Sequence, residues 1–105
     1  MPPPSHREPL PLEAVRDLLG IARALYRAER SSIPSSAKRL RDLEAIGRDL
    51  RTALRMATQT PDPDTLGHRA AWERAARATE RLTELVDDFQ PLRPALNATA
   101  AKVRR

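Results

Sequence analysis

Catalytic and metal sites are most often built from cysteine, histidine and closely spaced carboxylates, and this sequence contains few of these residues. It has no cysteine, which excludes disulfides, thiolate zinc sites and thiol nucleophiles. His68 is the only histidine within helical patterning, and no metal-ligand spacing surrounds it. Asp87 and Asp88 are adjacent, but neighbouring side chains of a helix point about 100° apart, so they do not form a catalytic dyad. We therefore expect no enzymatic activity, no metal and no cofactor.

The residues around His68 are those of a packed helix rather than of a phosphoacceptor site. Four-helix histidine phosphotransfer domains are of similar size, and their motif is His, any residue, Leu, Lys, Gly, in which the glycine leaves room for the phosphate. Here the sequence is His-Arg-Ala-Ala-Trp, which differs at all three of those positions and places an indole where the room is needed. We expect His68 to border the hydrophobic core beside Trp72.

The strongest compositional bias is an excess of arginine. The chain has 19 basic and 14 acidic residues, for a net charge of +5, and 17 of the 19 basic residues are arginine. Arginine binds phosphate and carboxylate groups bidentately, so the ratio is compatible with anion recognition. A high-GC bacterial genome produces the same excess of Arg, Ala and Pro, however, so the positions of the charges are more informative than their number.

Basic residues on the outer surface of the second predicted helix make nucleic-acid binding the alternative functional hypothesis. Asp42, Glu44 and Asp49 interrupt this surface, and no aromatic residue is interleaved with it for base stacking. The predicted helices are also too long for a helix-turn-helix motif. The candidate nucleic-acid contacts are Lys38, Arg41, Arg48, Arg51 and Arg55, together with Arg104 and Arg105 in the last two positions.

The spacing of the apolar residues predicts three long amphipathic helices. The first spans residues 11–30 and begins with a proline, which suits the first helical position. The second begins within residues 33–37, where serines offer N-caps, and ends by residue 60. For the third, Asp62 is the expected N-cap and Pro63 the first helical residue, and the helix continues to about Phe89.

The apolar stripes of these helices predict a core made of aliphatic residues with few aromatics. The third helix has small residues at its start and larger ones at its end, so the helices should approach most closely near its N-terminal half. The predicted core residues are Leu12, Val15, Leu18, Leu19, Ala22, Leu25 and Tyr26; Leu40, Leu43, Ile46, Gly47, Leu50, Ala53, Leu54 and Ala57; and Ala71, Trp72, Ala75, Ala78, Thr79, Leu82, Leu85, Val86 and Phe89.

A chain of 105 residues has the size of a single domain, which we divide into three parts. Residues 1–9 form a proline-rich flexible arm and residues 10–89 the bundle. Residues 90–105 form a basic C-terminal segment whose apolar spacing is compatible with a short helix over residues 94–103, either docked on the bundle or loose. The expected fold class is therefore all-α: an up-down-up three-helix bundle with a short fourth C-terminal helix.

The first helix carries a second strip of small residues beside its core stripe. Gly20, Ala24 and Ala28 recur at intervals of four with Ile21 next to them, and such small side chains let another backbone approach closely. Glycine costs about 1 kcal/mol relative to alanine in an exposed helix, so its presence is easier to explain if something packs on it. We expect either the C-terminal segment or the same helix of a second subunit to cover this strip.

These observations favour a non-catalytic helical module for protein–protein interaction or assembly, with a protein partner or a second copy of the chain. The four residues of the strip are the candidate partner contacts. The sequence contains neither an apolar run of signal-peptide length at its start nor one long enough to cross a membrane. We therefore expect a cytoplasmic protein without membrane insertion.

Overall fold

Four α-helices make up the regular structure of the protein. The computed structural model describes residues 8–86 and 93–103, and within them it contains no strand. The bounds of the helices are α1 Leu12–Ser31, α2 Ala37–Gln59, α3 Leu66–Leu85 and α4 Arg93–Ala101. The expected all-α fold, with three long helices and a short C-terminal one, is confirmed.

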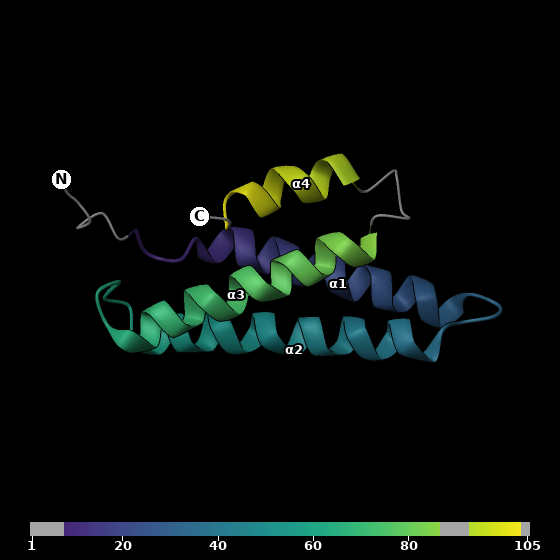
Figure 1. The fold of residues 1–105 in the computed structure, drawn as a ribbon, viewed down its shortest axis with the longest axis horizontal. Coiled ribbons are helices and arrows are strands. Elements are labelled where there is room, and N and C mark those ends of the chain that lie inside the picture. The colour runs from purple at the N-terminus through teal and green to yellow at the C-terminus, as the bar shows by residue number, and fades with distance from the viewer. Residues whose placement is uncertain (1–7, 87–92, 104–105) are drawn as a thin grey trace.

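The three long helices run up, down and up, with α2 packed against both of the others (Figure 1). The short helix α4 lies across the top of the molecule in this view and packs against α1 and α3. Its apolar residues Leu96 and Ala100, together with Val103 just beyond its end, are buried. Of the two arrangements expected for this segment, docked or loose, the docked one is therefore found, because these side chains lose contact with water only by packing on the bundle.

The core follows the predicted stripes closely. Leu18, Ile46, Leu50 and Leu82 are completely buried between the long helices, and small residues such as Ala75 fill the places where α3 approaches its neighbours. Every residue of the predicted stripes that the structure describes is buried or half-buried, and Phe89 lies outside the described residues.

The connection between α1 and α2 is held by a buried carboxylate. Glu29, near the end of α1, accepts a hydrogen bond from the backbone N–H of Ser36 at 2.7 Å and one from Nη1 of Arg39 at 3.4 Å. The Ser36 side chain in turn caps α2 by accepting from the N–H of Arg39 at 3.2 Å. The start of α2 thus falls where serine caps were expected.

The predicted start of α3 is wrong by three residues. The helix begins at Leu66, and its N-cap is Thr65, whose hydroxyl accepts from the N–H of His68 at 3.2 Å. Asp62 instead forms a turn: its carboxylate accepts from the N–H of Asp64 at 3.0 Å, and its carbonyl accepts from the N–H of Thr65 at 3.1 Å. Asp followed by Pro suits the first two positions of a β-turn as well as it suits a helix start, and here the turn is formed.

The N-terminal segment is tied to α3 from Glu8 onwards. Leu10 is buried, and its backbone N–H donates to Nε2 of His68 at 2.9 Å. Nε1 of Trp72 donates to the carbonyl of Glu8 at 3.0 Å. His68 and Trp72 therefore lie together at the edge of the core, as expected. Residues 1–7, the greater part of the predicted arm, lie outside the described residues.

Candidate functional site: an arginine-lined groove between α1 and α2

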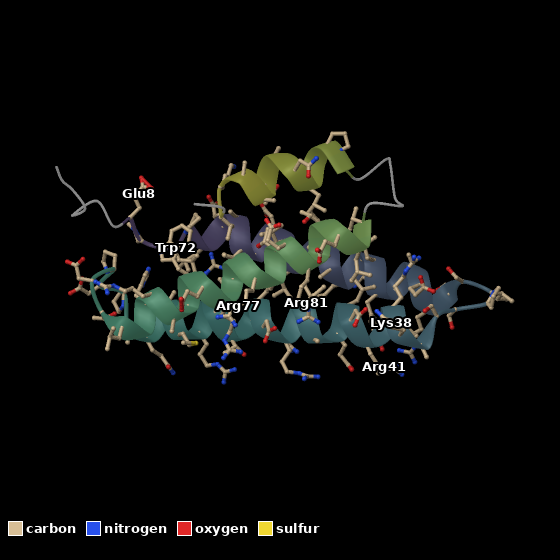
Figure 2. All side chains as sticks on the ribbon, in the orientation of Figure 1. Glu8, Lys38, Arg41, Trp72, Arg77 and Arg81 are labelled. Atoms are coloured by element: carbon tan, nitrogen blue, oxygen red, sulfur yellow. The ribbon has the colours of Figure 1, made fainter. Side chains whose placement is uncertain are left out.

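The basic residues predicted on α2 are all exposed. Arg41, Arg48 and Arg55 recur at intervals of seven and lie on one side of the helix with Arg51. Figure 2 shows Arg41 on the side of α2 that faces away from α3 and α4. Arg104 and Arg105, the other two predicted contacts, lie outside the described residues.

Lys38 differs from these arginines because it already has a partner. Its Nζ lies 2.8 Å from Oδ2 of Asp42, which is one helical turn further along α2. The hydrogen bond from Lys38 holds the pKa of the Asp42 carboxyl below its ordinary value. Lys38 is therefore a weaker candidate for binding an external anion than the arginines on the same helix.

A groove between α1 and α2 brings one of these arginines together with two from α1. Arg23 and Arg27 line it from α1, and Arg51 lines it from α2. Glu44 also lines the groove and is its only acidic lining residue. We call this feature, with a volume of about 250 Å³, the arginine groove; its lining residues are Leu19, Ala22, Arg23, Tyr26, Arg27, Leu43, Glu44, Gly47 and Arg51.

The floor of the arginine groove is apolar. Leu19, Ala22 and Leu43 belong to the hydrophobic core and show only a small part of their surface here. Gly47 keeps the floor open: a Cβ atom added to it would lie 3.7 Å from Cδ1 of Leu19, an ordinary van der Waals distance. A methyl group at this position would therefore fit without displacing the core.

The arginines of the groove have no carboxylate partner within the described part of the chain. No ion pair closer than 4.0 Å joins Arg23, Arg27 or Arg51 to an acidic residue of residues 8–86 or 93–103, and the same holds for Glu44 and the basic residues there. Between α2 and α3, by contrast, Asp49 pairs with Arg74 at 3.1 Å and with Arg81 at 3.6 Å. Arginines are thus held in ion pairs between α2 and α3 but not in the arginine groove, where Glu44 is the one carboxylate and lies beyond ion-pair distance.

The contribution of α1 to this site was missed by reasoning from the sequence. Arg23 and Arg27 are four residues apart and each follows an apolar residue at the border of the core stripe, Ala22 or Tyr26. This position at the edge of the stripe indicates a side chain that flanks a helix–helix contact. It does not tell which helix lies on the other side, so the meeting with Arg51 could not be derived from the sequence.

The strip of small residues on α1 is uncovered. Gly20, Ala24 and Ala28 are exposed, and a Cβ atom added at Gly20 would meet no described atom within 4 Å. Ile21 is half-buried and packs against the core. The expectation that the C-terminal segment covers the strip is therefore wrong for the described residues, because α4 docks where its larger side chains reach the core between α1 and α3. Coverage by a second subunit stays a prediction.

A second, larger depression lies on the outer surface of α3. It measures about 600 Å³ and is lined by Pro63, Leu66, Arg69, Ala70, Trp72, Glu73 and Ala76. Leu66 is 79% exposed there. The indole N–H of Trp72 is already engaged with the carbonyl of Glu8, so the depression is mainly an apolar surface next to the N-terminal segment.

Comparisons with known proteins leave the function to be argued from this geometry. No family model matches the chain, and neither a curated protein nor a solved structure matches it. Among the described helices, none is both long enough and apolar enough to span a membrane. The described residues also contain no group of three His, Asp or Glu side chains placed to hold a metal ion.

Proposed function

We propose that the protein is a non-catalytic helical interaction module that binds an anionic partner through the arginine groove. The observation that carries this proposal is the placement of Arg23, Arg27 and Arg51 around an apolar floor without an acidic partner in the described fold. A guanidinium group offers a fork of N–H donors that matches a carboxylate or a phosphate. An external anion would therefore supply the neutralising charge that the α2–α3 side obtains from Asp49.

The size of the groove favours a macromolecular partner. Its volume of about 250 Å³ is below the roughly 300–1,000 Å³ of pockets that enclose small-molecule ligands. A shallow groove between two antiparallel helices suits side chains projecting from the surface of another macromolecule.

Nucleic-acid binding is the second candidate, and the exposed arginines of α2 favour it. Arg41, Arg48 and Arg55 continue the positive surface of Arg51 along the helix. If they contact phosphates, binding should weaken steeply with salt because each contact releases counterions.

NMR titration of the isotope-labelled chain with two simple anions tests the proposed function. The probes are poly-L-glutamate and single-stranded oligothymidylate. We expect at least one of them to shift the backbone amide signals of Gly47 and its neighbours in the arginine groove. The double variant Arg23→Ser with Arg27→Ser should lose these shifts.

The control variant carries Arg69→Ser and Arg77→Ser on α3, which change the net charge equally but lie outside the groove. It should retain the shifts. If neither probe perturbs the groove, or if both double variants respond alike, the proposed function is wrong.

A further inference from the structure

Resting on the anion-binding role proposed above, we infer that the partner in the arginine groove is an acidic amphipathic helix of another protein. Such a helix carries carboxylates beside a row of aliphatic side chains. Three features of the groove select this chemistry over a nucleic acid: its floor, the arrangement of its arginines and the presence of Glu44.

The floor offers a place for aliphatic side chains. Leu19 and Leu43 border the hollow left by Gly47, and a leucine inserted there would remove apolar surface of both molecules from water. A phosphate backbone has no apolar group to bury at this position. The floor therefore contributes to binding only when the ligand has an apolar row between its charges.

The arginines stand on both rims at helical spacing. Arg23 and Arg27 are one turn apart on α1, which is about 5–6 Å along the helix, and Arg51 lines the same groove from α2. Glutamates four residues apart on a docked helix have the same spacing. The two rims thus match carboxylates on either side of a central aliphatic row.

Glu44 disfavours a ligand that is uniformly anionic. Its carboxylate lines the same groove as the arginines and has no basic partner among the described residues. A continuous row of phosphates would meet this charge with repulsion, whereas a helix can place a lysine, an arginine or a neutral residue opposite it. Glu44 therefore acts as a selective element within a positive site.

A second copy of the chain does not satisfy the groove by symmetric docking. In a two-fold dimer through this surface, two grooves that each carry three arginines and one glutamate would be brought together, and their like net charges disfavour this arrangement. We therefore take the partner to be another protein whose contact surface carries the complementary charge.

Fluorescence anisotropy with defined probes tests the inference. The main probe is a labelled helical peptide with leucine at every third or fourth position and glutamate flanking this row. A second peptide has the leucines replaced by glutamine, a third has the glutamates replaced by lysine, and oligothymidylate represents nucleic acid. We expect the first peptide to bind at least about tenfold more tightly than each of the others at physiological salt.

Filling the floor provides a variant that leaves the charge unchanged. Gly47→Met places a side chain in the hollow and replaces a helical glycine, so the variant should melt at or above the parent temperature. We expect it to weaken binding of the leucine–glutamate peptide about tenfold and to leave oligothymidylate binding unchanged. Glu44→Gln should strengthen the binding of oligothymidylate more than that of the peptide, because an unbroken row of phosphates meets this charge directly.

The possible failures are distinguishable. Tighter binding of oligothymidylate than of the peptide, or an unaltered peptide affinity in folded Gly47→Met, would overturn the helix assignment while leaving an anion-binding groove in place. A protein that oligomerises through the groove in light scattering would overturn it as well. Absence of binding to every anionic probe would refute both the inference and the proposed function.

Discussion

The backbone N–H of Leu10 donates to Nε2 of His68 at 2.9 Å, which joins residues 58 positions apart. Nδ1 of the same ring lies 2.8 Å from the carbonyl oxygen of Thr60. With Nε2 as the acceptor, this arrangement corresponds to the tautomer that has its proton on Nδ1 and donates it to Thr60. His68 is only 2% exposed, so it connects the N-terminal segment, the end of α2 and α3 as a structural residue with both nitrogens in use.

Replacing His68 should destabilise the fold even when the substitute is apolar. His68→Leu leaves the Leu10 N–H and the Thr60 carbonyl without partners, and each unsatisfied buried group costs about 1–3 kcal/mol. Urea unfolding should show a loss of at least about 2 kcal/mol. Trp72→Phe, which removes one hydrogen bond to Glu8, should cost only about 1 kcal/mol and serves as the comparison. A His68→Leu protein as stable as the parent would show that this junction does not contribute to folding.

The N-terminal segment should matter for stability only from Glu8 onwards. We expect deletion of residues 2–7 to leave the melting temperature nearly unchanged, because this proline-rich stretch has no apolar periodicity. Deletion of residues 2–10 should lower it by several degrees, since it removes the buried Leu10 and its bond to His68. Equal melting temperatures for the two deletions would contradict the docking of Leu10.

The centre of the bundle is expected to lie at Leu50 and Leu82, both completely buried. Leu50→Ala or Leu82→Ala should each reduce the free energy of unfolding by about 2–5 kcal/mol through lost burial and a residual cavity. Leu66→Ala is the matched control because Leu66 is 79% exposed, and its effect should stay within about 0.5 kcal/mol. Chemical denaturation of the three variants measures the loss of unfolding free energy for each. A larger loss for Leu66→Ala than for the two core variants would mean that the helices pack through other faces.

The three glycines should respond differently to alanine. Gly20→Ala meets open space and Gly47→Ala an ordinary contact, so each should stabilise the protein by about 0.5–1 kcal/mol by restricting the unfolded chain. In Gly67→Ala the added Cβ would lie 3.0 Å from Oγ1 of Thr60, which is held in place by its 2.7 Å bond to the Met56 carbonyl. This variant should gain nothing or lose stability. Thermal melts compare the stability of the three variants. If Gly67→Ala had the highest melting temperature, the close approach of Gly67 in α3 to Thr60 at the end of α2 would be contradicted.

Glutamate at Ala24 tests whether a second subunit covers the strip of small residues. Ala24 is exposed, so we expect Ala24→Glu to change the free energy of unfolding by less than about 0.5 kcal/mol. Light scattering then compares the masses of parent and variant. A parent twice as heavy as Ala24→Glu identifies the strip as an interface between copies. Equal masses would show that the strip is not such an interface.

The helices and their buried faces follow from local sequence patterns. Residues such as Ile46, Leu50 and Ala53 recur with the 3.6-residue period of a helix, and this period is a local property that needs no knowledge of the neighbours. Serine caps before Ala37 were recognisable for the same reason. Where two local preferences competed, as at Asp62 and Pro63, the sequence did not decide between a turn and a helix start.

Which helix faces meet, and what lies between them, depends on contacts between segments that are distant in the sequence. The arginine groove depends on the register of α1 against α2, which brings Arg23 and Arg27 into the same groove as Arg51. The role of His68 depends on a contact with Leu10, far away in the chain. The exposure of Gly20 and Ala24 depends on where α4 docks. In each case the stabilising free energy comes from packing side chains of separate segments against one another. The pattern within one helix does not specify which helix is its neighbour.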